Sequence, residues 1–253
     1  MTAAPTRSAY RFALATACAL ALAACGGKEE GTAATAPSGE PIAAIPAPAG
    51  QNWADTYSVT AEGGYLMGNP NAPIKLVEFA ALSCSHCADF SEQSATELRE
   101  KFVSSGRVSL EMRFFMLNAL DVPATLLATC SAPEATLPLA KQFWAWQREM
   151  FTNLQANEAA LQSASQLPPE QRFGAIAKAG GMDAFFASRG VAADQGNACL
   201  ANTAKATQLV EATNKAGEQY NITGTPTFLL NGAKLDANTW EAVKVALEKA
   251  GAR

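Results

Sequence analysis

Short apolar runs of strand type occupy both ends of the folded part of the chain, and helical periodicity fills the middle. Residues 57–60 alternate between polar and apolar side chains, and residues 74–80 form a nearly continuous apolar run. Every second residue from 108 to 114 is apolar within the run 107–117. These patterns predict strands, and residues 89–102 show the spacing of a helix. A β–α–β unit with a right-handed crossover over a parallel pair is therefore expected.

Helical spacing dominates from residue 118 to residue 220. Proline, glycine and asparagine separate the segments that show it, which are 124–131, 136–151, 157–166, 169–178, 182–188 and 193–217. A run of helices between two groups of strands predicts an inserted helical domain.

A strand, a tight turn and a last helix are predicted after the helical stretch. Residues 227–230 read as the strand, Asn231-Gly232 as a hairpin turn and residues 233–235 as the return strand. Asn238 is expected to cap the final helix, whose apolar side chains share one face.

The first 25 residues have the pattern of an export signal. Arg7 and Arg11 precede the apolar run 12–24, which is short for a membrane-spanning helix but suits the core of a signal peptide. The run ends in Leu-Ala-Ala-Cys-Gly, which resembles the bacterial lipoprotein box. Cys25 is then expected to carry lipid, and Gly26 after it favours the outer membrane. An ordinary signal peptide cleaved at nearby small residues is the alternative.

Composition sets the remaining limits. With 49% apolar residues among 253, the chain can form a packed core, and its formal net charge of −4 argues against binding to nucleic acid. The stretch that follows the signal is rich in Gly, Ala, Pro and Thr, so we expect a flexible tether. The predicted parts are a signal peptide with lipobox (1–25), a tether (26–52), an α/β domain in two pieces (53–118 and 220–253) and the helical insertion (119–219).

Four residues, Cys84-Ser85-His86-Cys87, carry the main chemical signal. They follow the apolar strand and open a helix, where free N–H groups and the helix dipole stabilise a thiolate. His86, the only histidine in the sequence, could donate to that thiolate or add positive charge beside it. Two thiols at this spacing predict a redox site that works by disulfide exchange.

A metal site is the alternative use of these residues, because CxxC is also half of a zinc site. Cys84, His86 and Cys87 lie too close together to surround one tetrahedral ion, and no second histidine could complete the set. We therefore expect no metal. A purely structural lipoprotein is the third possibility.

The order of these features resembles the DsbA-like branch of the thioredoxin superfamily. The resemblance rests on the strand, the CxxC at a helix start, the next strand, the helical insertion and then Gly-Thr-Pro-Thr-Phe at 224–228. It covers roughly residues 55–250. It implies an α/β thioredoxin fold with an inserted helical domain, and no cofactor beyond the redox-active disulfide.

The resemblance also implies roles for individual residues. Cys84 would be the exposed nucleophile and Cys87 the shielded resolving thiol. Pro226 would be cis and would present the backbone of Thr225 to an extended substrate. Glu78 would lie beneath the site as a proton acceptor for the resolving thiol, with a pKa raised by burial. The plain alternatives are a trans proline, a solvent-facing Glu78 and a histidine without a role.

Cys130 and Cys199 lie inside the helical stretch. With Cys18 in the signal peptide and Cys25 modified by lipid, four cysteines would remain to pair, and an even number in an exported protein suggests two disulfides. We expect this pair to be structural rather than a redox relay, closing a loop of about 70 residues that contributes roughly 4 kcal/mol. Phe143, Trp144 and Trp146 are expected in the helical core rather than in a binding site.

The predicted function is that of a thiol:disulfide oxidoreductase, held on a membrane and facing the periplasm, that oxidises exported proteins. Its partners would be reduced or unfolded exported proteins and a membrane reoxidase, and we expect a monomer. Disulfide isomerase or reductase activity on the same fold is the alternative. Thr225 favours that alternative, whereas residues 26–52 are too short to form the dimerisation domain of known isomerases.

Overall fold

A mixed sheet forms the centre of the molecule, and its two middle strands run parallel. The computed structural model describes residues 39–253. In that part the strands are β1 (Tyr57–Val59), β2 (Tyr65–Gly68), β3 (Ile74–Ala80), β4 (Val108–Phe114), β5 (Thr227–Leu230) and β6 (Ala233–Lys234). Their order in the sheet is β1-β2-β4-β3-β5-β6. Only β3 and β4 pair in parallel, and the other neighbouring strands are antiparallel.

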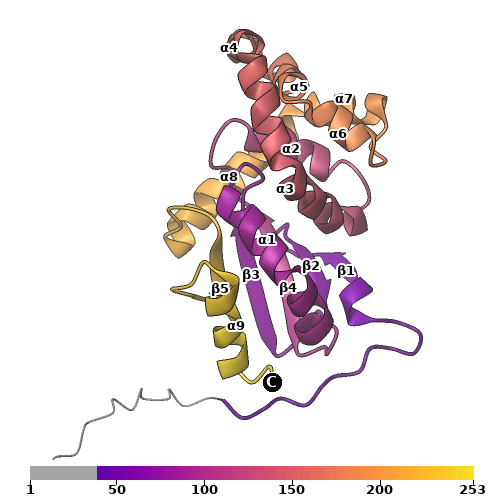
Figure 1. Ribbon diagram of the computed structural model, residues 1–253, viewed down its shortest axis with the longest axis vertical. Coiled ribbons are helices and arrows are strands. Elements are labelled where there is room, and N and C mark those ends of the chain that lie inside the picture. Colours follow the sequence, from indigo (N-terminus) through magenta and orange to yellow (C-terminus); the bar gives the residue numbers. More distant parts are fainter. Residues whose placement is uncertain (1–38) are drawn as a thin grey trace, which may run out of the picture. The chain divides into compact units, whose positions relative to one another are not determined.

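Helices cover both faces of the sheet and gather at one end of it. They are η1 (Trp53–Asp55), α1 (Ser85–Glu97), the π-type helix η2 (Leu98–Val103), α2 (Asp121–Ala128), α3 (Pro133–Ala156), α4 (Glu158–Ser165), α5 (Pro169–Ala179), α6 (Met182–Ala187), α7 (Ala193–Leu200), α8 (Thr203–Tyr220) and α9 (Trp240–Lys249). All the helices from α2 to α8 lie between β4 and β5 in the chain. Those from α2 to α7 gather at the end of the sheet where β3 and β4 finish (Figure 1).

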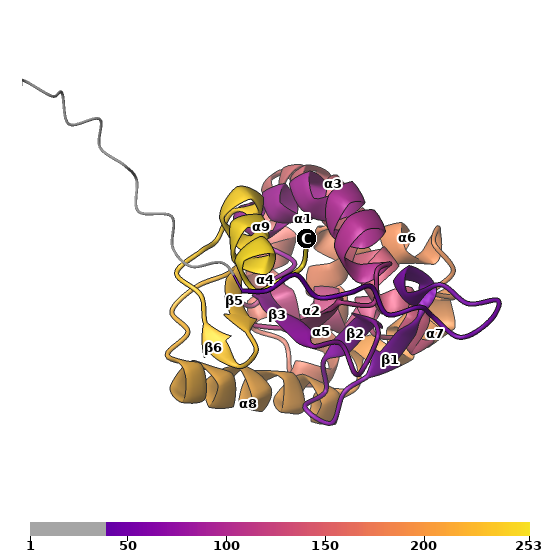
Figure 2. The same ribbon diagram turned by 90° about the horizontal axis from the view of Figure 1, so that it is seen from below.

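The alternation of β3 divides its side chains between the two faces of the sheet. Ile74 and Leu76 pack in a core cluster with α1, η2 and α9, whereas Val77 and Phe79 pack with the end of α8. Figure 2 shows α8 on the opposite side of the sheet from α1 and α9. Because side chains alternate along a strand, Glu78 lies on the same face as Leu76, beneath α1.

The predicted β–α–β unit, the helical stretch and the final hairpin are all confirmed. Asn231 and Gly232 both have positive φ, 49° and 85°, which is the backbone that a tight hairpin turn requires. Three details of the prediction were wrong. Strand β2 was missed, the helix expected over 193–217 is split at Asn202 into α7 and α8, and the last helix is capped by Thr239 rather than Asn238.

The expected tether at 26–52 was also wrong for its second half. Residues 39–52 lie along the folded unit, because their backbone groups form hydrogen bonds with it. The N–H of Ile42 donates to the carbonyl of Gly251, and the N–H of Ile45 donates to that of Ser105. Both isoleucine side chains are half-buried. Ile42 and Ile45 lie in a low-complexity sequence that gave no sign of their contact with the folded unit.

None of the helices within residues 39–253 is long and apolar enough to cross a membrane.

Candidate active site

Cys84 is the N-cap of α1, directly after the loop that follows β3. Its backbone is extended, with φ −83° and ψ 119°, and its Sγ accepts a hydrogen bond from the N–H of Cys87 at 3.3 Å. Cys84 is 7% exposed and Cys87 is fully buried. Both are free thiols, so the structure describes the reduced form. Cys84 is less exposed than expected, but it is the one of the two that solvent reaches.

The surroundings of Cys84 favour a thiolate. Its pKa is lowered from 9.0 to about 6 by a hydrogen bond from the Cys87 thiol, by the Thr225 side chain and by the backbone N–H groups of Cys87 and His86, although burial opposes the shift. The pKa of Cys87 is raised, first by burial and then by its hydrogen bond to Cys84 and the charge of Glu78. At neutral pH only Cys84 therefore ionises readily.

Of the two roles expected for the His86 side chain, donation to the sulfur and a nearby positive charge, the structure does not show the first. The side chain is exposed, and the imidazole makes no hydrogen bond to any of the residues that the structure describes. The direct contact that it offers to Cys84 is its backbone N–H. The predicted donation from the imidazole is therefore wrong for this conformation, which leaves the side chain only the effect of a nearby charge.

Thr225 and Pro226 face the nucleophile from the far end of the helical stretch. The peptide bond between them is cis, and the Cys84 thiol donates to the Thr225 carbonyl at 3.2 Å. The Thr225 hydroxyl is buried and has no hydrogen-bond partner within residues 39–253, so it is free to donate to a thiolate. Beside it is a hollow of about 380 Å³, which is lined by residues 223–227 and 234–238. This hollow leaves Thr225 and Pro226 open on one side.

Glu78 lies under the cysteines. It is 4% exposed and pairs in the sheet with Met112 and Phe228, and its Oε1 has no hydrogen-bond partner in the described part of the chain. Burial, and then the charge of Cys84, raises its pKa from 4.5 to about 8. The carboxyl therefore holds a proton at neutral pH. It also lines a cavity of about 380 Å³ between α1, α3 and the sheet, which has room for water to reach it.

Three side chains that the sequence did not single out for the site hold the loop before Cys84. Asp121 is fully buried and accepts hydrogen bonds from the N–H and hydroxyl of Ser83. Trp144 and Gln147 of α3 donate to carbonyls of the same loop. Trp144 was expected only in the helical core. Gln147 lies within the predicted helix 136–151 and Asp121 lies just before the predicted helix 124–131, and nothing in the sequence pattern marked either residue for the site.

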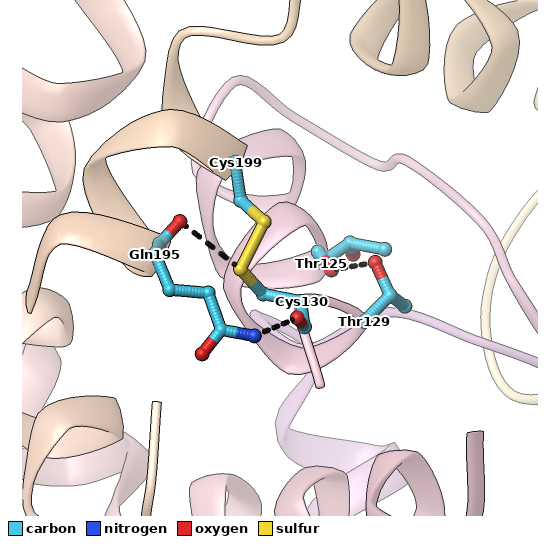
Figure 3. The surroundings of a disulfide bond; sticks show 5 residues. All are labelled: Thr125, Thr129, Cys130, Gln195 and Cys199. Atoms are coloured by element: carbon cyan, nitrogen blue, oxygen red, sulfur yellow. Dashed lines mark hydrogen bonds between the residues drawn. A yellow bond between two sulfur atoms is a disulfide. The ribbon is translucent and has the colours of Figure 1, made fainter. Parts of the chain in front are cut away.

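Cys130 and Cys199 are joined by a disulfide within the helical stretch. Their sulfur atoms are 2.05 Å apart, and the bond links residues separated by 69 positions (Figure 3). Gln195 donates from its side-chain amide to the carbonyl of Cys130 at 2.6 Å. The disulfide ties the loop after α2 to α7, whereas the redox pair lies at the start of α1. Cys25, the expected lipid site, lies outside the described residues.

Metal ligands do not gather around the cysteines. Within residues 39–253, no group of three or more His, Cys, Asp or Glu side chains could hold a metal ion.

Comparison with known proteins identifies the family. The thioredoxin family model matches residues 60–249, which is more than half of the chain. A protein-disulfide isomerase from Novosphingobium aromaticivorans is 30% identical. The match covers 74% of this chain and 97% of that one, with a TM-score of 0.70. Alpha-DsbA1 of Wolbachia pipientis is 21% identical and shares the fold, with a TM-score of 0.57. This match covers 77% of this chain and 94% of that one.

Relatives in sequence point the same way. A Rickettsia bellii protein named as a protein-disulfide oxidoreductase is 22% identical over 198 residues, 77% of this chain and 68% of that protein. The chain spans 59% of the corresponding Rickettsia conorii protein. The expected thioredoxin fold with a helical insertion is confirmed. The chain belongs to the thioredoxin family, and its likeness to a protein-disulfide isomerase and to protein-disulfide oxidoreductases supports thiol:disulfide oxidoreductase activity.

Proposed function

We propose that the protein is an oxidase that transfers the disulfide of Cys84 and Cys87 to reduced exported proteins. The hydrogen bonding around Cys84 Sγ at the start of α1, which lowers the pKa of this thiol, is the observation that carries this proposal. Hydrogen bonds that stabilise the thiolate stabilise the reduced form, and a stable reduced form makes the disulfide a stronger oxidant. Each 30 mV of potential corresponds to about 1.4 kcal/mol.

The exchange would take place in two steps. A substrate thiolate attacks Sγ of Cys84, so that a mixed disulfide forms, the Cys84–Cys87 bond breaks and Cys87 leaves as a thiolate. A second substrate thiolate then attacks the substrate sulfur of the mixed disulfide and releases Cys84 as a thiolate. The substrate loses two electrons to the enzyme pair, and the protons of its two thiols go to Cys87 and to solvent.

Glu78 would serve the buried sulfur in both directions. Its carboxyl is protonated near neutral pH and can pass a proton to the departing Cys87 thiolate, which burial makes costly. When a membrane reoxidase restores the disulfide, the same group accepts the proton of Cys87. A raised pKa close to the working pH suits both transfers.

The site of action would be the periplasmic side of a membrane, with the outer membrane favoured. This part of the proposal rests on the sequence before residue 26, where Cys25 follows an apolar signal core and resembles a lipid attachment site. A lipid there would keep the enzyme close to newly exported chains.

Isomerase or reductase activity is the second candidate. The Novosphingobium relative is named as an isomerase, and threonine before the proline resembles the isomerases. The two activities are separated by supplying the purified protein with fully reduced ribonuclease and, separately, with scrambled ribonuclease in glutathione buffer. The oxidase proposal expects faster recovery from the reduced substrate. Faster recovery from the scrambled substrate would make the protein an isomerase.

Two variants link the activity to the cysteines. Cys84→Ser should abolish oxidation, because no disulfide remains to attack. Cys87→Ser should retain mixed disulfides on Cys84, and mass spectrometry of those adducts would identify the natural substrates. Transfer that survives in Cys84→Ser would contradict the mechanism.

A further inference from the structure

Side chains of the helical insertion hold the backbone of the loop that ends in the nucleophile. Every residue from Ala81 to Cys84 has a backbone group bonded by one of them. Asp121 accepts from the N–H of Ser83 at 2.8 Å, and the Trp144 indole donates to the carbonyl of Ala81 at 3.0 Å. These two side chains are 0% and 7% exposed, so their bonds are shielded from competing water.

Among Asp121, Trp144 and Gln147, only Gln147 forms a hydrogen bond with the backbone of Cys84 itself. Its side-chain amide donates to the carbonyl of Leu82 at 2.6 Å and to that of Cys84 at 3.1 Å. An amide nitrogen carries two N–H groups, so each carbonyl can receive one of them. Gln147 is 4% exposed, so its loss would leave the Leu82 carbonyl without this donor at a depth where water does not readily replace it, and the Cys84 carbonyl would keep one donor of two.

The Cys84 carbonyl is thereby fixed from two sides. It accepts from the N–H of Ala88, within α1, and from Gln147, within α3. A fixed carbonyl fixes the plane of the peptide that joins Cys84 to Ser85. The first turn of α1, whose N–H groups at His86 and Cys87 stabilise the sulfur, starts from that peptide.

We propose that Gln147 is a positioning residue for the Cys84 thiolate, acting through the carbonyls of Leu82 and Cys84. The helical insertion, besides covering the end of the sheet, would then set how strongly the site oxidises. This inference deepens the proposed function. Its test uses differences between variants and wild type, so it can fail while the oxidase proposal stands, and the reverse also holds.

A purely structural role makes a different prediction. A side chain that only supports the fold stabilises the oxidised and reduced forms equally, so its loss leaves the redox equilibrium unchanged. If Gln147 acts through Cys84, its loss must destabilise the reduced form more, because that form carries the thiolate.

Gln147→Met removes both donors and keeps a side chain of similar length. Gln142→Met, five residues earlier on α3 and exposed, is the matched control. We expect Gln147→Met to raise the Cys84 pKa by about one unit. The pKa is measured from the thiolate absorbance as a function of pH. We also expect it to lower the equilibrium constant for reduction of the Cys84–Cys87 disulfide by glutathione about tenfold. This corresponds to a reduction potential about 30 mV more negative. The control should match wild type in both measurements.

If Gln147→Met does not fold, Gln147→Asn replaces it. Asparagine keeps the amide but is shorter by one methylene, and the same two quantities, the Cys84 pKa and the glutathione equilibrium, are measured. A wild-type pKa and a wild-type glutathione equilibrium in the folded variant would overturn the proposal. Equal losses of melting temperature in the oxidised and reduced forms would also overturn it, because they would leave only structural support.

Discussion

Cys84 and Cys87 are three residues apart, yet their surroundings act on their charge in opposite directions. Hydrogen bonds lower the pKa of Cys84, whereas burial, the bond to Cys84 and the charge of Glu78 raise the pKa of Cys87. The chemistry is asymmetric as a result, because the sulfur that solvent can reach is also the one that is stable as a thiolate. Incoming thiolates should therefore attack Cys84.

His86→Ala should raise the Cys84 pKa, and the size of the effect should depend on salt. The imidazole is exposed and does not bond to the sulfur, so it acts through its charge alone, which is screened over about 10 Å at 0.1 M ionic strength and over about 3 Å at 1 M. Titration of the thiolate at both salt concentrations measures this. An equal difference between variant and wild type at both would point to a direct contact instead.

Glu78→Gln should change how stability depends on pH. The Glu78 pKa is about 8 in the folded protein and 4.5 in its ordinary state, so from pH 4.5 to 8 the folded state holds a proton that the unfolded state has lost. Wild-type stability must therefore fall as pH rises through this window. The glutamine variant should lack this fall and gain a few kcal/mol relative to wild type at pH 8.

The measurement is the free energy of unfolding in urea at pH 4.5 and pH 8. The oxidised protein is used, so that Cys84 does not titrate; burial is then the cause that raises the Glu78 pKa, since the charge of Cys84 is absent. Parallel pH dependence in the variant and wild type would mean that Glu78 is not held protonated by the fold.

The cysteine pair was accessible from its spacing and its place at a strand–helix junction, whereas Glu78 was accessible through the family resemblance, because alternation alone left open whether it faced solvent. In the structure Glu78 lies two residues after Leu76, on the face that α1 covers. Gln147 and Asp121 could not be predicted in the same way. Gln147 is a polar residue on a predicted helix, which is ordinarily exposed, and Asp121 precedes the predicted helix 124–131. Only tertiary packing brings these two against the loop before Cys84.

At the scale of elements, predictions succeeded where one periodicity extended over several residues. Strands β3 and β4 were found because each runs for seven residues with a clear apolar pattern. Strand β2 has four residues and ends in Gly68, so its identity depends on pairing with β1 and β4 rather than on its own pattern. Long-range pairing of this kind leaves little trace in local sequence.

Replacing Cys130 and Cys199 together by serine should lower stability without ending disulfide transfer. The bond closes a loop of about 70 residues, and its loss should cost up to roughly 4 kcal/mol on the chain-entropy model. Neither sulfur belongs to the loop that holds Cys84. Thermal unfolding and the oxidation of a reduced peptide are the two measurements. Lost transfer in a folded double variant would instead make the pair a redox relay.

At the scale of the whole molecule, the two parts of the fold meet at the active site. The core cluster that includes Cys84 and Cys87 also contains side chains of α2, α3, α5 and α6. A second cluster joins α1 and α9 to the sheet without the helical stretch. The redox pair thus lies in the core that the helical insertion builds, so changes in the insertion can reach its chemistry.

Attachment to a membrane is a prediction for the whole chain. Cys25→Ser should abolish lipid attachment and move the protein from the membrane fraction to the soluble fraction, or leave an uncleaved precursor. Fractionation and intact mass of the wild type and variant measure this. A wild-type mass with an unmodified N-terminus at another residue would contradict the tether.

The redox equilibrium of the Cys84–Cys87 pair with glutathione tests the central claim most directly. Stabilisation of the Cys84 thiolate predicts a reduction potential in the oxidising range, between about −180 and about −120 mV, where protein disulfide isomerase and DsbA lie. Mass spectrometry of alkylated protein across a series of glutathione ratios gives this value. A potential near the −270 mV or so of thioredoxin would contradict the account, because the pair would then reduce disulfides rather than donate one.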